Sequence, residues 1–289
     1  MNRIALGTVQ FGLPYGIANQ RGQVSVDEAR LILTHAHAAG VEMLDTAIAY
    51  GNSEQRLGEM GVQQWQVVSK LPAVPNGCVD IRGWVYQSVE ESLQRLQVNH
   101  LRGLLLHRPE QLLSVQGEQL YAALSQLVSD GLVRKIGVSI YEPDEFQRLG
   151  EQFDFGIVQI PFNILDHRLL DSGLLHRLCQ QGTEVHVRSV FLQGLLLMHP
   201  AERPPQFEPW RALWQRWQGW LEEVRLSPLQ ACLLYVMSFP GIAKVIVGVD
   251  SLTQLKEILQ AAEGAIPEIP SELNCTDIDL INPSRWAMV

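Results

Sequence analysis

A regular alternation of short apolar runs and amphipathic segments, repeated along the whole chain, most constrains the fold. Most of the apolar runs are uninterrupted, as expected for parallel strands that are buried on both faces. Eight runs of this kind can be counted, at residues 3–11, 41–47, 65–70, 101–107, 132–140, 155–161, 183–191 and 243–249. The chain is therefore expected to contain a parallel sheet of eight strands.

The segments between these runs have the pattern of amphipathic helices. In residues 25–40, Ser25 is a good N-cap, Glu28 follows at the capping-box position, and Gly40 is a stop signal. Three further segments follow the same logic, at residues 82–98, 117–131 and 227–241. Eight strand-then-helix units in roughly 250 residues are typical of an α/β fold of the (β/α)8 TIM barrel type. A doubly wound sheet is the competing architecture, but eight consecutive units without a composition shift favour a closed barrel.

The chain is predicted to form one domain over residues 1–289, because no Pro-, Gly- or Ser-rich linker divides it. Residues 199–210 are expected to be a loop inserted after the seventh strand, and the last stretch, of about 25 residues, an irregular tail. A helix near residues 207–224 carries one stripe of tryptophans at positions 210, 214, 217 and 220. We expect the stripe to pack against the barrel, with an oligomer contact as the alternative.

Composition narrows the class of protein. The net charge of −9 argues against nucleic acid and an anionic membrane face as partners. The four cysteines are scattered, and His35 and His37 point to different faces of a helix, so we expect no disulfide and no metal. The N-terminus lacks the apolar core of a signal peptide, and no apolar run is long enough to span a bilayer. A cytoplasmic protein is predicted, with its oligomeric state open.

Four polar side chains stand where active-site residues of a barrel are expected, at the ends of strands or in the loops that follow. Asp45 ends the second run, Tyr50 lies in the loop after it, Lys70 ends the third run, and His107 ends the fourth. A lysine that closes an apolar strand needs a carboxylate, and Asp45 on the neighbouring strand can supply one. A cationic Lys70 beside Tyr50 stabilises the phenolate, which makes Tyr50 a usable general acid. His107 can hydrogen-bond the substrate oxygen that receives the proton.

These residues lie in stretches that resemble the aldo-keto reductase family over nearly the whole chain. The segment "DTAIAYGNSEQRLG" is similar to the family's second-strand motif, "VVSK" to its third-strand lysine, "LLLHRP" to its fourth-strand histidine, and "IGVS" to its fifth strand. The resemblance implies a catalytic tetrad of Asp45, Tyr50, Lys70 and His107. It also implies reduction of aldehydes or ketones with a nicotinamide cofactor bound across the barrel mouth. The sequence has neither a Rossmann nor a Walker glycine motif, which agrees with this cofactor mode.

The resemblance also implies which residues bind the cofactor. Ser139 and Gln159 are expected to hold the nicotinamide carboxamide, and the stretch from Ser189 to Leu195 to line the pyrophosphate. The adenosine end of the cofactor is expected to bind at the start of the last helix. Together with strand-end residues and two positions discussed below, the full set of candidate cofactor residues is Thr8, Ser139, Gln159, Arg188, Ser189, Gly194, Gly248, Asp250, Ser251 and Gln254.

Three positions depart from the family pattern. Ile140 replaces the usual asparagine after "GVS", and Arg188 stands where an aromatic residue commonly stacks on the nicotinamide. We expect Arg188 to meet a negative group, either the cofactor pyrophosphate or an anionic substrate, with a salt bridge to Glu184 or Asp166 as the alternative. Asp250 stands where a cation often grips the 2′-phosphate of NADPH. An acid repels that phosphate and accepts hydrogen bonds from a free ribose, so NADH is favoured over NADPH, although Asp250 could simply cap the last helix.

The predicted function is therefore reduction of a small carbonyl compound, sugar-like or anionic, by NAD(P)H, or the reverse alcohol oxidation. A second interpretation is an aldolase-type lyase that uses Lys70 as a Schiff-base nucleophile. Pairing with Asp45 argues against it, since a paired lysine stays protonated. A third is a non-catalytic, nucleotide-binding regulatory subunit in the same fold.

Overall fold

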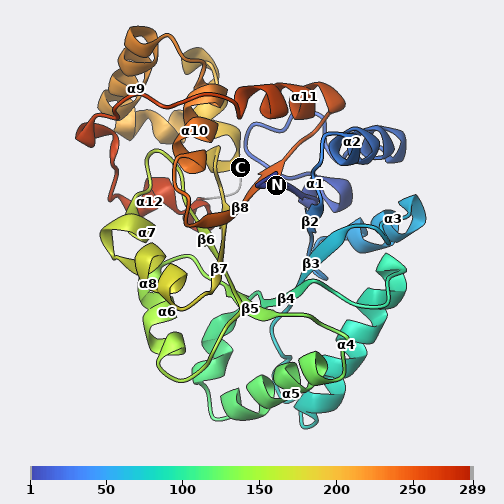
Figure 1. Ribbon diagram of the computed structural model, residues 1–289. Coiled ribbons are helices and arrows are strands. Elements are labelled where there is room, and N and C mark those ends of the chain that lie inside the picture. The colour runs from blue at the N-terminus through green and yellow to red at the C-terminus, as the bar shows by residue number, and fades with distance from the viewer. Residues whose placement is uncertain (1, 287–289) are drawn as a thin grey trace.

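The computed structural model describes residues 2–286, in which eight parallel strands close into a barrel (Figure 1). Strand order follows chain order, and β1 closes the ring by pairing with β8, with Ala5 opposite Ile246. The strands are β1 Ile4–Gly7, β2 Met43–Asp45, β3 Gln66–Leu71, β4 Gly103–Leu106, β5 Ile136–Ser139, β6 Ile157–Pro161, β7 Glu184–Arg188 and β8 Ile242–Gly248. The predicted (β/α)8 barrel is confirmed.

Helices surround the barrel as an outer ring in Figure 1. The α-helices are α1 Val9–Gly12, α2 Val26–Ala38, α3 Ser53–Met60, α4 Ile81–Leu96, α5 Gly117–Ser129, α6 Pro143–Gly150, α7 Arg168–Asp171, α8 Leu174–Gln180, α9 Arg211–Val224, α10 Pro228–Met237, α11 Leu252–Ala261 and α12 Ile278–Ile281. Short 3-10 segments are η1 Pro109–Leu113, η2 Leu192–Leu197, η3 Pro200–Glu202, η4 Pro205–Trp210, η5 Ser271–Leu273 and η6 Pro283–Arg285. The predicted helices 25–40, 82–98, 117–131 and 227–241 correspond to α2, α4, α5 and α10.

Two separate apolar clusters hold this arrangement together. The larger one lies between the strands and the helices. The smaller one consists of buried side chains from strands β1, β2, β3, β4, β6 and β8, namely Ala5, Met43, Val68, Leu105, Ile157 and Ile246. These side chains fill the barrel interior, as the inward-facing layers of a closed barrel do. The polar residues of the site therefore stand on a packed floor, beyond this apolar layer.

Most strands are shorter than the runs in the sequence, and two of them end well before their run does. The run 3–11 forms a strand only to Gly7, because Val9–Gly12 turns into the short helix α1. The run 183–191 forms a strand only to Arg188, because Ser189 has a left-handed backbone with φ of 60°. Both breaks fall at the carboxyl end of the barrel, where the chain must leave the sheet and enter a loop.

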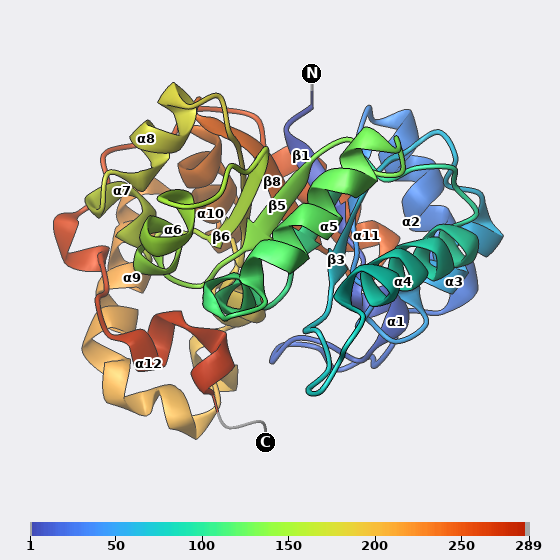
Figure 2. The ribbon, with the colours of Figure 1, turned by 90° about the horizontal axis from the view of Figure 1, so that it is seen from below.

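Three tryptophans of the predicted stripe lie on α9 and face the protein, whereas Trp210 precedes this helix in η4 and is half-buried. Trp214, Trp217 and Trp220 are buried, and each indole nitrogen donates to a backbone carbonyl. The stretch 199–210 is more regular than predicted, because it forms η3 and η4. Figure 2 shows α1, α9 and α12 toward the same end of the barrel. Among residues 2–286, no helix has the length and apolar character needed to cross a membrane.

Candidate active site

A cleft of about 560 Å³ opens at the carboxyl ends of the strands. Thirteen of the residues predicted for catalysis or cofactor binding line it: Thr8, Asp45, Tyr50, Lys70, His107, Ser139, Gln159, Arg188, Ser189, Gly194, Gly248, Asp250 and Gln254. Ser251 is the exception. Its side chain is buried and caps α11 by accepting a hydrogen bond from the Gln254 backbone, at 3.3 Å. The structure thus brings together nearly all of the predicted set.

Lys70 and Asp45 form a buried ion pair at the floor of the cleft. The Lys70 ammonium lies 2.5 Å from Asp45 Oδ1 and also donates to the Thr46 carbonyl at 3.0 Å. Only 1% of Lys70 is exposed. Burial lowers the pKa of Lys70, but the charge of Asp45 and the contacts with Asp45 and Tyr50 outweigh it and raise the pKa above its ordinary value. The lysine is therefore held as a cation.

The second carboxylate oxygen of Asp45 is also bound. Gln159 Nε2 donates to Asp45 Oδ2 at 2.6 Å across the barrel, from β6 to β2. The amide oxygen of Gln159 is left facing Ser139 Oγ, 3.5 Å away. On the other side, Thr8 Oγ1 donates to the Asp45 backbone carbonyl at 3.1 Å. Asp45 is thus fixed by residues from three different strands or strand ends.

Tyr50 reaches the ion pair from the loop that follows β2. Its hydroxyl lies 3.4 Å from the Lys70 ammonium, and the ammonium stands 5.0 Å from the centre of its ring. The backbone here packs so closely on α1 that a Cβ on Gly12 would lie 1.8 Å from the Tyr50 carbonyl oxygen. A glycine at position 12 is therefore needed for Tyr50 to occupy this place.

His107 directly follows β4 and faces Tyr50 edge-on, with the ring centres 5.9 Å apart. Burial lowers the pKa of His107 to about 4, and the nearby charges of Lys70 and Arg188 act in the same direction. The imidazole is therefore neutral at ordinary pH. A neutral imidazole carries one N–H donor, so His107 can donate a hydrogen bond into the cleft without bringing a charge.

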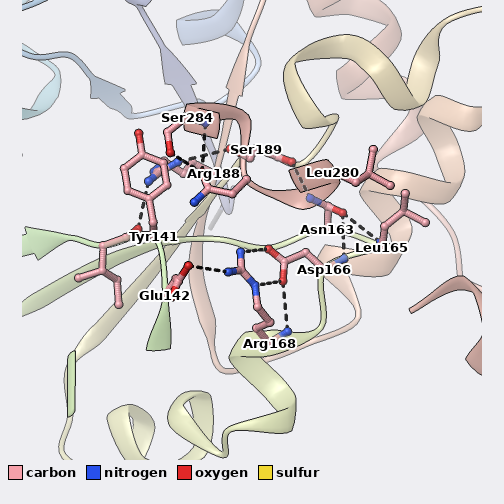
Figure 3. A network of polar contacts seen from close by, with 12 residues as sticks. Tyr141, Glu142, Asn163, Leu165, Asp166, Arg168, Arg188, Ser189, Leu280 and Ser284 are labelled. Carbon is pink, nitrogen blue, oxygen red and sulfur yellow. Dashed lines mark hydrogen bonds and ion pairs between the residues drawn. The ribbon is translucent and has the colours of Figure 1, made fainter. Parts of the chain in front are cut away.

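Arg188 reaches from the end of β7 across to the end of β5 (Figure 3). Its guanidinium lies 4.4 Å from the centre of the Tyr141 ring and donates to the Ile140 carbonyl at 3.0 Å. The two acids expected as alternative partners are engaged elsewhere. Glu184 pairs with Arg102 and Lys135, and Asp166 pairs with Arg168. The salt-bridge alternative for Arg188 is therefore wrong.

The adenosine end of the predicted site is acidic. Asp250 lines the cleft, and its backbone N–H donates to Gln254 Oε1 at 2.7 Å, while its carboxylate accepts a hydrogen bond from Asn19 at 3.4 Å. The N-cap of α11 is Ser251, so the interpretation of Asp250 as the cap is wrong. Burial raises the pKa of Asp250, which Arg21 partly counteracts.

Sequence reasoning missed several residues that line the cleft. Tyr15 and Asn19 lie between β1 and α2, and Tyr141 lies two residues after the "IGVS" motif of β5. The Tyr15 hydroxyl accepts a hydrogen bond from Gln193 in the loop after β7 at 3.2 Å. The position of Tyr141 beside "IGVS" could have indicated it. Tyr15 and Asn19 gave no such signal, because only the fold brings their loop to the β7 and β8 loops.

Comparison with known proteins identifies the family of this chain. The model of the aldo/keto reductase family matches residues 3–269. An aldo-keto reductase from Mycobacterium sp. (strain KMS) is 34% identical over 62% of this chain, and the match spans 64% of that relative, less than two thirds of its length. A D-threo-aldose 1-dehydrogenase from Pseudomonas sp. is 25% identical over 93% of both chains.

Among solved structures, the holo form of an aldo-keto reductase from Bacillus halodurans has the same fold. Its TM-score with this chain is 0.75, at 20% identity, covering 98% of this chain and 95% of that one. Taken with the match to the family model over residues 3–269, the closed barrel and the strand-end motifs establish that this chain belongs to the aldo/keto reductase family of oxidoreductases.

Proposed function

We propose that the protein reduces an aldehyde or ketone with a nicotinamide dinucleotide, and that Tyr50 is the general acid. The observation that carries this proposal is the meeting of Tyr50, Lys70, Asp45 and His107 at one end of one cleft. Two of the contacts are close: Lys70 lies 2.5 Å from Asp45 and 3.4 Å from the Tyr50 hydroxyl. A permanent cation beside a phenol stabilises the phenolate left behind when the proton is given up.

Each member of the four then has a distinct role. Tyr50 gives its proton to the carbonyl oxygen, and a dinucleotide held in the cleft would supply the hydride that the carbonyl carbon needs to become the alcohol. Asp45 keeps Lys70 protonated and in place. His107, being neutral, donates a hydrogen bond to the oxygen and stabilises the charge that develops there. In the reverse direction the Tyr50 phenolate takes the proton from the alcohol.

The residues that line the cleft fit a nicotinamide dinucleotide. Gln159 uses its amide nitrogen on Asp45, and its oxygen accepts only a long 3.5 Å contact from Ser139 Oγ, so this oxygen can also accept from a carboxamide. Gln10 Oε1 is buried in the described structure without a hydrogen-bond partner, and it lies beside Gly248 in the cleft. After β7 the backbone turns through left-handed conformations at Ser189, Gln193 and Gly194, which bends this loop along the cleft. Arg188 adds a cation for the pyrophosphate or an anionic substrate.

We further propose that NADH is preferred to NADPH. Asp250 lines the cleft at the expected adenosine end, and Glu257 of α11 lines it as well. Both are repulsive toward a phosphate that carries a charge of about −1.5 to −2. Arg21 lies close enough to Asp250 to lower its pKa, but it is an exposed side chain, and its attraction is screened by solvent.

The walls around the catalytic residues suit a small polar substrate, sugar-like or anionic. Tyr15, Tyr141 and Arg188 stand beside Tyr50 and His107 and offer two hydroxyls, two ring faces and a cation. Aromatic faces with polar edges bind polyhydroxylated carbons, while the guanidinium binds a carboxylate or phosphate. One relative is named as an aldose dehydrogenase, which supports the sugar-like class.

The aldolase interpretation has little support in this geometry. A Schiff-base lysine must be neutral to attack a carbonyl. Lys70 donates to Asp45 and to the Thr46 carbonyl, and its pKa is raised. The regulatory-subunit interpretation differs from the reductase in turnover alone, so only an assay separates them.

The proposal is tested by following NADH and NADPH oxidation at 340 nm with a panel of aldoses, ketones and aldehydes, some of them carboxylated or phosphorylated. Wild type and Tyr50→Phe are compared on every compound. Turnover by wild type that is lost in the variant supports the reductase. Cofactor binding without turnover on any compound favours the regulatory subunit, and borohydride trapping of Lys70 with a carbonyl compound favours the aldolase.

A further inference from the structure

Glu28 lies near the start of α2, but its carboxylate binds the start of α11. The Ser25 side chain accepts a hydrogen bond from the Glu28 backbone at 3.2 Å, which is one half of the predicted capping box. The other half is missing, because Glu28 Oε1 accepts a hydrogen bond from the Leu252 backbone N–H at 2.6 Å. Leu252 is the first residue of α11. Glu28 therefore places a negative charge at the N-terminus of a helix 224 residues away.

Two further N–H groups near this helix start are occupied as well. The Gln254 N–H donates to Ser251 Oγ at 3.3 Å, and the Asp250 N–H donates to Gln254 Oε1 at 2.7 Å. A helix N-terminus binds a phosphate because its first N–H groups are unpaired and its dipole favours an anion. Here the first-turn N–H groups of Leu252 and Gln254, and the Asp250 N–H just before the helix, are bound by the chain's own side chains, and the acceptor of Leu252 is itself an anion.

Asp250 and Gln254 connect this helix start to the cleft, since both line it. Glu28 itself is not among the residues that line the cleft, but its carboxylate holds the Leu252 N–H, two residues after Asp250. A 2′-phosphate on the adenosine ribose at this end of the cleft would therefore approach Asp250 first, and the helix start behind it would already be occupied by the Glu28 carboxylate. The phosphate would have to displace side-chain acceptors from the backbone amides and would place like charges side by side. A ribose with a free 2′-hydroxyl meets neither obstacle, because it carries no charge and can donate to Asp250.

We propose that Glu28 is a specificity-determining residue, which excludes NADPH by filling the anion site of α11 with its own carboxylate. The inference rests on the proposed function, because it takes a nicotinamide dinucleotide to be the ligand of the cleft. Glu28 would thus act together with Asp250 in the choice between NADH and NADPH, although the two residues come from opposite ends of the chain.

Glu28→Gln is a sharp test, since the glutamine amide keeps an oxygen that can accept from Leu252 while the charge is removed. Asp27→Asn is the matched control, because Asp27 is an exposed acid in the same first turn of α2. Dissociation constants for NADH and NADPH are measured by fluorescence titration of each protein, with no carbonyl compound present. Thermal unfolding of each variant verifies that it is folded.

Wild type is expected to bind NADH at least about tenfold more tightly than NADPH. In Glu28→Gln, NADPH affinity is expected to rise by about tenfold while NADH affinity stays within about twofold, because the negative charge at the helix start is lost and NADH has no 2′-phosphate for that charge to repel. Asp27→Asn is expected to match wild type. In wild type, added NaCl is expected to narrow the gap between the two cofactors, because it screens the repulsion.

The inference is overturned if the ratio of NADPH affinity to NADH affinity changes no more in Glu28→Gln than it does in Asp27→Asn. Wild-type preference for NADPH also overturns it. If Glu28→Gln does not fold, the salt dependence of wild type decides, and a gap that does not narrow with salt counts against Glu28. Failure of wild type to bind either dinucleotide is a different result, since it overturns the proposed function itself.

Discussion

Gln159 and Asp45 are joined across the barrel by a hydrogen bond of 2.6 Å, from the glutamine amide to the carboxylate oxygen that Lys70 does not use. The residue expected to hold the cofactor and the residue expected to hold the catalytic lysine are therefore parts of one buried network. The bond fixes which end of the Gln159 amide faces Ser139, and it completes the partners of a carboxylate that is only 4% exposed. The glutamine that is expected at the cofactor site thus also supports the ion pair at the floor of the cleft.

Gln159→Leu is expected to destabilise the protein even without a ligand. Leucine leaves Asp45 Oδ2 buried without a donor, which costs about 1–3 kcal/mol of unfolding free energy. Urea unfolding followed by circular dichroism measures the change. Ser139→Ala is the control, because it removes only a 3.5 Å contact on the other side of Gln159 and is expected to have a smaller effect. Equal losses in both variants would contradict a special role for the bond to Asp45.

Tyr50→Phe is expected to lower kcat for carbonyl reduction on the order of 10²–10⁴-fold, because the proton donor is lost. Dinucleotide affinity should stay nearly unchanged, since the ring remains in place. Steady-state kinetics and cofactor titration on the same preparations give both numbers. A variant with wild-type kcat on a true substrate would show that the proton comes from another group.

Gly12→Ala tests whether the backbone of α1 positions Tyr50. The added methyl group would lie 1.8 Å from the Tyr50 carbonyl oxygen, so one of the two segments must move. We expect a large loss of kcat together with a lower melting temperature. Gly22→Ala is a useful comparison, because Gly22 has open space around its Cβ position and is strained only by its φ of 74°. Retention of full kcat by Gly12→Ala would show that the loop accommodates the shift without moving the hydroxyl.

The sequence was sufficient to predict the barrel and most of the site, for a physical reason. In a parallel barrel every strand points the same way, so residues that end successive strands must converge, whatever the loops do. Asp45, Lys70 and Gln159 lie on strands, and for them the strand pattern was enough. Tyr15 and Asn19 depend on the path of one loop over the barrel mouth, which periodicity does not specify.

Glu28 illustrates a different limit of sequence reasoning. Its position three residues after Ser25 is the capping-box pattern, and the pattern predicts a local bond. The carboxylate instead serves Leu252, because the fold brings the amides of α11 within its reach. For Arg188 likewise, the sequence offered two nearby acids, but each has a closer cation in the structure. Which partner a charged side chain binds depends on the distances in the folded protein, and the sequence pattern does not specify these distances.

The pKa of His107, lowered to about 4, predicts a specific pH dependence of stability. The unfolded chain binds a proton on this residue below about pH 6.5, whereas the folded chain does so only near pH 4. Its contribution to stability is therefore complete above about pH 6.5 and is lost as the pH falls toward 4. Urea unfolding at several pH values in this window should show a smaller loss in His107→Gln than in wild type. The pH profile of kcat/KM of wild type should show no inflection near pH 6.5. An inflection there that disappears in His107→Gln would mean that the imidazole has an ordinary pKa and would contradict this prediction.

The last prediction concerns Arg188, whose guanidinium is held between the Ile140 carbonyl and the face of Tyr141 in the cleft. We expect Arg188→Leu to raise KM for an anionic substrate, or the dissociation constant of the dinucleotide, by about tenfold or more, because a charge-assisted contact is lost. Arg188→Lys is the matched variant. It keeps the charge but loses the planar group that stacks on Tyr141, so it should recover part of the affinity if charge matters and little if stacking dominates. Cofactor titration without substrate separates the two ligands: an unchanged dinucleotide affinity with a raised KM assigns the guanidinium to the substrate. Unchanged values for both ligands in Arg188→Leu would leave only the packing on Tyr141 as the role of this residue.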